Sequence, residues 1–164
     1  MTSEPGAGAS GPELITADQE TTAVVRGVVR MSELRGFFDH SFQALPVAIS
    51  AQDVAIMSPA FAFYHQPPGE TADLEVGFIT DRAIQPDGDV AAGSIPGGRV
   101  ARLVHLGGYE GLGASWERLN SWIREQGLTP GQTIWEYYVT EPTPDMDPSE
   151  LRTELNWSVE DNQG

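Results

Sequence analysis

The 164-residue sequence predicts an α+β fold made of two similar halves, each of which runs strand, helix, strand, strand. Segments rich in β-branched residues alternate with segments of helical apolar spacing, in the same order twice. The last strands of the two halves, residues 73–78 and 152–157, also align without a gap, and this alignment matches Phe78 with Trp157. Two such βαββ units form an antiparallel sheet with both helices on one face. A concave ligand pocket is expected at their pseudo-two-fold junction.

The first half begins with a predicted strand at residues 21–30, where Thr and Val dominate. Ser32 is a suitable N-cap for the helix that follows, and Pro46 is expected to end or kink that helix. Strands are predicted over residues 59–65 and 72–80, with a Pro-Pro-Gly turn between them. Four apolar side chains at helical spacing define the helix: Leu34, Phe38, Phe42 and Leu45.

The second half repeats this order. A strand is predicted over residues 98–106, and Gly127 is a suitable C-cap for the helix that follows. The closing strands are predicted over residues 133–140 and 151–159, on either side of an acidic, Pro-rich loop at residues 141–148. One helix face is marked by Leu112, Trp116, Leu119 and Ile123.

The chain is expected to hold one ordered domain. Residues 1–12 are rich in Gly, Ala, Ser and Pro and are expected to form a disordered tail. The length suits a single core over residues 13–160. Within it, the repeated halves are expected at about residues 14–95 and 96–160.

The charge of the chain excludes several classes of partner. The net charge is −15, and all nine basic residues are Arg scattered along the sequence. Nucleic acid and anionic membrane surfaces would repel such a protein, whereas cationic ligands are favoured by the long-range field. The N-terminus lacks the basic start and apolar run of a secretion signal, and no apolar stretch reaches membrane-spanning length, so a cytoplasmic protein is expected.

No metal or cofactor is expected. The chain contains no cysteine, which excludes disulfides, thiolate metal sites and cysteine nucleophiles. Its three histidines, His40, His65 and His105, show no metal-ligand spacing. The sequence also shows no Ser-His-Asp pattern, so any hydrolysis is expected to act on a strained, activated substrate.

The most informative segment is the aromatic strand Trp135-Glu136-Tyr137-Tyr138. Alternation along a strand places Glu136 and Tyr138 on one face and the other two rings on the opposite face. If the Glu136 face is buried, its carboxylate needs a partner, and the sequence contains no Lys or Arg between Arg124 and Arg152. Such a carboxylate is suited to binding a cation from outside. The alternative is a Glu that faces water beside ordinary core rings.

The chain resembles the GyrI-like (gyrase-inhibitory-protein-like) small-molecule-binding domains, which also serve as effector-binding domains of bacterial multidrug-responsive transcription regulators. The order and spacing of several motifs between about residues 14 and 159 make the match specific. Gly108 stands where the family usually has Pro, in a turn that should not affect ligand chemistry. The motifs are Pro59 to His65, Val104-His105-Leu106-Gly107-Gly108-Tyr109-Glu110-Gly111-Leu112, Trp122-Ile123, Trp135 to Tyr138 and Thr153-Glu154-Leu155.

The resemblance implies a βαββ duplication with a central pocket and an acidic residue at the pocket floor, which matches Glu136. Family regulators bind lipophilic cations there among stacked aromatic rings. They also carry a DNA-binding domain, whereas only a dozen residues precede the domain in this sequence. A standalone version is therefore expected.

The candidate ligand-binding residues are a carboxylate and the rings that could surround it. The sequence does not decide which face of the first-half strand lines the pocket, and an aromatic groove is expected on the face that the helices leave uncovered. Tyr109, at a strand-to-helix turn, could reach the pocket rim, and Trp116 is interpreted as core. The candidates are Glu136, Tyr138, Trp157, Phe61, Phe63, Tyr109, Phe78 and Phe38.

Three functions follow from this interpretation. The first is a binding module that captures hydrophobic, often cationic, planar compounds above an acidic floor. The second is a hydrolase of strained, cyclopropane-bearing electrophiles, as the resemblance suggests, with Glu136 activating water and Tyr138 or Tyr109 acting as the acid. The third, ranked well below these, is an inhibitor protein that contacts gyrase.

Overall fold

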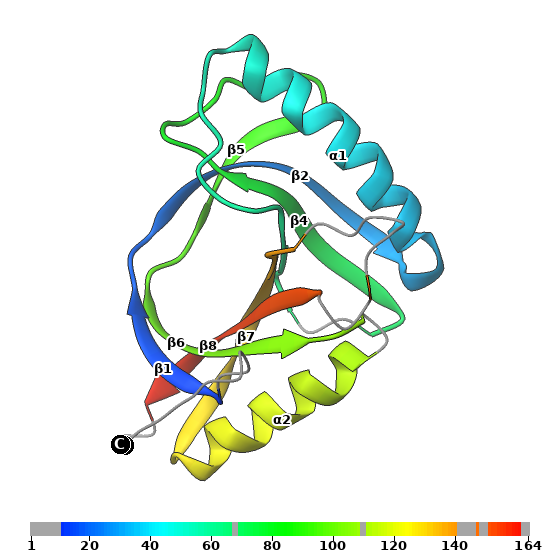
Figure 1. Ribbon diagram of the computed structural model, residues 1–164. Coiled ribbons are helices and arrows are strands. Elements are labelled where there is room, and N and C mark those ends of the chain that lie inside the picture. Colours follow the sequence, from blue (N-terminus) through cyan, green and yellow to red (C-terminus); the bar gives the residue numbers. More distant parts are fainter. Residues whose placement is uncertain (1–10, 67–68, 109–110, 141–146, 148–150, 162–164) are drawn as a thin grey trace.

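The structure, a computed structural model, describes residues 11–66, 69–108, 111–140, 147 and 151–161, and these form one antiparallel sheet and two α-helices (Figure 1). A 3-10 turn at Met31–Glu33 leads into the first helix. The elements are β1 (Glu13–Ala17), β2 (Glu20–Arg30), α1 (Leu34–Ala51), β3 (Phe61–Tyr64), β4 (Thr71–Ile79), β5 (Val90–Ile95), β6 (Gly98–Leu106), α2 (Leu112–Glu125), β7 (Leu128–Tyr138) and β8 (Arg152–Asp161).

The order of the strands confirms the expected duplication. The sheet runs β1-β6-β8-β7-β3-β4-β2-β5. Exchanging β1 with β5, β2 with β6, β3 with β7 and β4 with β8 gives the same order in reverse, as a pseudo-two-fold axis requires. The axis passes between β3 and β7, the pair that joins the halves. By this symmetry β5 belongs to the second half, whereas the boundary expected near residue 95 places it in the first.

The first strand of each half pairs with the other half. β1 pairs with β6, and β5 pairs with β2. Only two residues separate β1 from β2 and β5 from β6, so each edge strand continues directly into a strand beside the opposite edge. The sheet must therefore curl, and Figure 1 shows β1, β2, β5 and β6 bending round one side of the molecule. At the bend, a Cβ on Gly97 would lie 2.8 Å from the backbone N of Gln19, so the crossing of the two ribbons requires glycine there.

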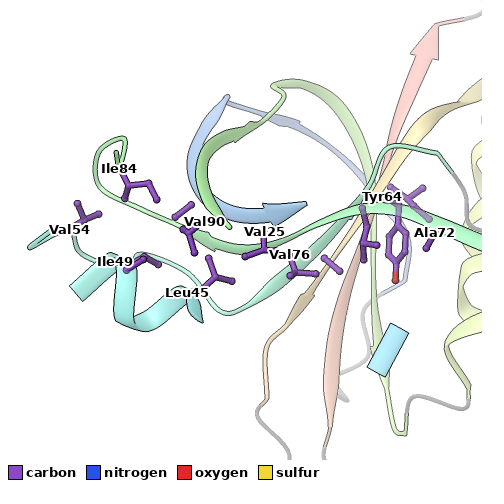
Figure 2. Close-up of a cluster of buried hydrophobic side chains, with 14 residues drawn as sticks. Val25, Leu45, Ile49, Val54, Tyr64, Ala72, Val76, Ile84 and Val90 are labelled. Atoms are coloured by element: carbon purple, nitrogen blue, oxygen red, sulfur yellow. The ribbon is translucent and has the colours of Figure 1, made fainter. Parts of the chain in front are cut away.

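Both helices pack on one face of the sheet, called the helix face below. α1 covers β2, β4 and β5, and α2 covers β6 and β7. Figure 2 shows the cluster under α1, in which Leu45 and Ile49 of the helix lie against strand residues including Val76 and Val90. The cluster under α2 is smaller and consists of Ala101, Leu103, Leu119, Ile123 and Leu155.

A second core lies on the opposite face, called the inner face below because the curled sheet bends around it. Its side chains come from β2, β3, β5, β6 and β7. Phe63 and Trp135 are stacked there with ring centroids 5.4 Å apart, and Phe61 is fully buried. The buried members are Val24, Phe61, Phe63, Ile95, Val100 and Trp135.

Helix α1 differs from the sequence prediction at both ends. Pro46 does not end it, because the helix continues to Ala51. The continuation buries Ala48 and Ile49, and that burial opposes the cost of a proline in a helix interior, which is ~3 kcal/mol. Ser32 is not the N-cap either; it lies in the 3-10 turn. By contrast, Gly127 has φ +79° and donates its N–H to the Arg124 carbonyl, as expected of a C-cap.

None of the helices in the part of the chain that the structure describes is long and apolar enough to cross a bilayer.

Candidate functional site

Glu136 lies on the helix face of β7, next to the pseudo-two-fold axis. Its direct cross-strand neighbours are Ala62 on β3 and Leu155 on β8. The residue is only 6% exposed. Ala62 itself is fully buried in the core cluster under α1. The alternative of a Glu that faces water is therefore wrong.

Both carboxylate oxygens of Glu136 accept a hydrogen bond from an aromatic residue. The indole Nε1–H of Trp116, on α2, donates to Oε2 at 2.9 Å. The hydroxyl of Tyr138, two residues further along β7, donates to Oε1 at 2.7 Å. Among the described residues no salt bridge involves Glu136. The acid is thus held by neutral donors, without a cation of its own.

Burial raises the pKa of the Glu136 carboxyl above its ordinary value, because an ionised carboxylate is poorly solvated among rings. The hydrogen bonds from Trp116 and Tyr138 and the nearby His105 side chain lower the pKa of Glu136 but do not cancel the effect of burial. Burial, and to a smaller extent the Glu136 charge, raise the pKa of Tyr64, which lies on the same face. A bound cation would favour the ionised form of Glu136.

Half-buried aromatic rings extend from Glu136 in two directions across the helix face. Towards α1, Tyr138 contacts Phe38 with ring centroids 6.2 Å apart, and Phe42 links Phe38 to Phe78 at 6.1 and 5.7 Å. Towards α2, Trp116 and Trp157 are 5.6 Å apart. These rings supply partly exposed apolar area, and Glu136 supplies one carboxyl group beneath them. Apolar rings with a few polar groups also line small-molecule sites. This ring cluster consists of Phe38, Phe42, Phe78, Trp116, Tyr138 and Trp157.

The pseudo-two-fold relates residues of the site in pairs. Ala62 pairs with Val76 as Glu136 pairs with Leu155, and Val76 matches Leu155 in the gap-free alignment. Ala62 and Glu136 therefore occupy equivalent positions and face each other across the axis. Tyr64 and Tyr138 are equivalent in the same way, as are Phe78 and Trp157. The surroundings are close to symmetric, whereas the carboxylate is present on one side only.

The structure brings together five of the candidate residues and separates two. Glu136, Tyr138 and Phe38 are connected directly or through rings, and Phe78 and Trp157 join the same cluster. Phe61 and Phe63 lie instead in the inner-face core with Trp135 and Tyr137, because alternation along β3 points them away from Ala62.

The expected aromatic groove on the face without helices is also absent among the described residues, since the curl of the sheet fills that face with its own side chains. Tyr109 lies outside the described residues. Three partners were not predicted as site residues: Trp116, interpreted as core, together with Phe42 and Tyr64.

The histidines show no metal site. No group of His, Asp and Glu side chains among the described residues could hold a metal ion. His40 contacts Asp89 at 3.3 Å and His65 contacts Glu75 at 2.8 Å, both as single pairs. His105 contacts Ser115 of α2.

The raised pKa of Glu136 predicts a pH-dependent cost in stability. An acid whose pKa is higher in the folded state binds more protons when folded. The stabilisation that comes from this extra proton is complete below the pKa of the unfolded chain, about 4.3. It is lost as the pH rises through the pKa of the folded state. Glu136→Gln should therefore unfold near the wild-type temperature at pH 4 and above it at pH 7, by ~2–4 °C if the cost is ~1 kcal/mol.

The measurement is the thermal midpoint of both proteins from pH 4 to pH 8. Glu117→Gln, on the exposed face of α2, is the matched control and should give a difference that does not change with pH. Parallel curves for wild type and Glu136→Gln would contradict a raised pKa.

The sequence model of the GyrI-like small molecule binding domain matches residues 12–160. The chain belongs to the GyrI-like family. No curated protein matches it. The duplicated βαββ architecture and the buried acid next to the axis thus belong to a GyrI-like small-molecule-binding domain.

Solved structures share the fold of this GyrI-like chain. The C-terminal domain of EcmrR superposes with a TM-score of 0.75 at 18% identity, over 94% of this chain and 99% of that domain. In the EcmrR–DNA complex the TM-score is 0.74 at 19% identity, and this chain spans 57% of the EcmrR chain. A hydrolase from Listeria innocua gives 0.64 at 14% identity, with 94% of each chain covered. SAV2435 bound to tetraphenylphosphonium gives 0.64 at 11% identity, over 92% of this chain and 94% of that one.

Proposed function

We propose that this GyrI-like domain captures hydrophobic, often cationic, planar compounds between α1 and α2, with the Glu136 carboxylate below the positive charge. The observation that carries the proposal is a buried acid whose partners are Trp116 and Tyr138 and not a cation. A hydrophobic cation can bring the missing charge to this carboxylate and bury its own apolar surface among the rings at the same time.

The rings supply the second part of the binding energy. A cation over an aromatic face gains ~0.5–2 kcal/mol, and the α1 side of the cluster offers Phe38, Phe42 and Phe78 without any hydrogen-bonding group. Apolar contact of this kind is not directional. Affinity for many ligand shapes, in the micromolar range, is the expected result. SAV2435 shares the fold and was solved with the lipophilic cation tetraphenylphosphonium bound, and this supports the proposed ligand class.

A titration of ethidium and Nile red tests the proposal. Ethidium is planar and carries a permanent charge, whereas Nile red is planar and neutral. Glu136→Gln preserves the shape of the side chain and removes its charge. We expect this variant to bind ethidium about 10- to 100-fold more weakly, since a charge-assisted contact is worth ~1.5–3 kcal/mol.

Nile red affinity should stay within about twofold, because apolar contact does not depend on the carboxylate charge. Fluorescence polarisation at pH 8 gives both dissociation constants, and Glu117→Gln controls for the change in net charge. Equal loss of both dyes would contradict a charge-specific role for Glu136, and unchanged ethidium binding would reject it.

A hydrolase of strained, cyclopropane-bearing electrophiles is the second candidate. The 2.7 Å hydrogen bond between Tyr138 and Glu136 favours it, because the pair could deliver a proton to a leaving oxygen or orient a water molecule. Incubation of such a substrate with the protein separates the two functions. Capture of one equivalent without turnover supports binding alone, whereas repeated turnover that Glu136→Gln abolishes supports the hydrolase.

A further inference from the structure

Ser115 and His105 form a hydrogen-bonded pair at the start of α2. Ser115 is the fourth residue of the helix, and its hydroxyl lies 2.7 Å from Nδ1 of His105, on β6. His105 is 8% exposed, while Ser115 is half-buried. A serine within hydrogen-bond reach of an imidazole is the core of a nucleophile–base pair.

The second nitrogen of His105 fixes the direction of this hydrogen bond. Nε2 lies 2.9 Å from the carbonyl oxygen of Gly108. A carbonyl only accepts, so Nε2 must carry the proton and donate it. In the neutral ring Nδ1 is then the acceptor, and the Ser115 hydroxyl donates to it. The Gly108 carbonyl thus orients the imidazole as the third group of a triad does.

Two of the residues just before Ser115 are glycines, Gly111 and Gly113. A Cβ on Gly113 would meet nothing within 4 Å, whereas one on Gly111 would lie 3.1 Å from Cε1 of His105. The first amide groups of a helix lack acceptors within the helix, and no side chain of the described residues caps this end of α2. Amides of this kind stabilise developing negative charge on a substrate oxygen.

A buried hydroxyl group lies between the Ser115–His105 pair and Tyr138 of the ring cluster. Thr153, on β8, is paired with His105 on one side and with Tyr138 on the other. Its Oγ1 is fully buried and has no hydrogen-bond partner among the described residues. The hydroxyl between the imidazole and the tyrosine is thus a buried polar group that the described residues leave unsatisfied.

We propose that Ser115 and His105 are a nucleophile and its base, and that this site cleaves activated esters. Ser115 Oγ attacks the ester carbon while its proton passes to Nδ1 of His105. The tetrahedral adduct collapses with loss of the alkoxide, which takes the proton from the imidazolium. A water molecule, deprotonated by His105, then hydrolyses the acyl-serine to release the carboxylic acid and restore Ser115.

The first test uses p-nitrophenyl acetate and a fluorophosphonate probe on the full chain. We expect release of p-nitrophenolate and a probe adduct that peptide mass spectrometry places on Ser115. Ser115→Ala and His105→Gln should each lower the rate of release by at least about a hundredfold, since a base and its nucleophile act as a unit. Ser121→Ala, on the exposed face of the same helix, is the matched control. An adduct elsewhere, or release unchanged in Ser115→Ala, overturns the proposal.

A second measurement separates catalysis from a structural hydrogen bond. Because the chain has no cysteine, Ser115→Cys carries a single thiol next to His105, and Ser121→Cys carries one far from it. Iodoacetamide should alkylate the first about tenfold faster at pH 7, since an adjacent base increases the thiolate fraction. Equal or slower alkylation would mean that the contact only links α2 to β6, and the proposal would fail.

The outcome is independent of the proposed binding function. Glu136→Gln should retain fluorophosphonate labelling at Ser115, and Ser115→Ala should retain ethidium binding. Loss of ethidium binding in Glu136→Gln together with full labelling would support both sites. Loss of labelling in Glu136→Gln at a pH where that variant is folded would assign the chemistry to Glu136 and overturn the role of Ser115.

Discussion

Gly77→Ala is expected to destabilise the protein by at least ~3 kcal/mol, more than overpacking usually costs, because the clash is with backbone. Gly77 lies in β4, opposite Val24 on β2 and Phe61 on β3. A Cβ at this position would lie 1.9 Å from the carbonyl oxygen of Ala23. That carbonyl is held in the ladder of the curled sheet, so it cannot rotate aside as a flexible side chain would. Glycine at position 77 therefore allows β2 and β4 to approach each other closely.

A comparison of the urea unfolding of Gly77→Ala with that of Gly36→Ala measures this effect. Gly36 lies in α1, and a Cβ added there would meet nothing within 4 Å, so alanine at this position should stabilise the helix by ~0.5–1 kcal/mol. The two variants make the same chemical change with opposite expected signs. A Gly77→Ala protein as stable as wild type would mean that β2 and β4 are further apart than the structure shows.

Phe61→Ala is expected to cost ~3–5 kcal/mol, since the ring is fully buried and its removal leaves a cavity. Ethidium affinity should nevertheless stay within about twofold, because the ring lies on the inner face and cation–ring contacts act within ~6 Å.

Phe38→Ala should show the reverse pattern. Its half-buried ring costs less stability when removed, whereas its contact with Tyr138 places it at the site. We expect ethidium binding about 3- to 30-fold weaker, for ~0.5–2 kcal/mol of ring contact.

Chemical unfolding and dye titration on the same protein samples separate the two faces. If Phe61→Ala is too unstable to titrate, Phe61→Leu keeps most of the buried volume and gives the same comparison. Weaker ethidium binding in Phe61→Leu than in Phe38→Ala would place the ligand on the inner face and contradict the proposed site.

Periodicity along the sequence was enough to predict most of the sheet. The strand over residues 98–106 coincides with β6, and the segments assigned to β2, β4, β7 and β8 differ from the structure mainly at their ends. β1 and β5 were missed because they are short and contain few β-branched residues. Pairing with the other half stabilises them, and such long-range pairing leaves no local pattern. The same argument applies to Pro46, where burial of the following turn outweighs a local helix-breaking signal.

Strand alternation marked Glu136 as a candidate with Tyr138 on the same face, and the family resemblance favoured a buried acid, but Trp116 was not identified as a partner. An acid among rings with no cation nearby is unusual in any strand, and the structure buries it. Trp116 was missed because helical spacing cannot separate a core indole from one that donates a hydrogen bond to a carboxylate. The choice of face could not be made either. Alternation divides Phe61 from Tyr64 but does not say which side the helices cover.

The placement of one carboxylate beside the pseudo-two-fold axis has a consequence for how such a site can arise. A symmetric dimer of a single repeat carries the same residue at both positions next to its axis. It would offer two alanines, which attract no cation, or two facing carboxylates, which repel each other and share a proton. A chain in which both repeats are covalently joined can vary the two positions separately, which a homodimer cannot do. Ala62 and Glu136 differ in this way, so the single carboxylate beside the axis is a feature that a homodimer of identical repeats could not have.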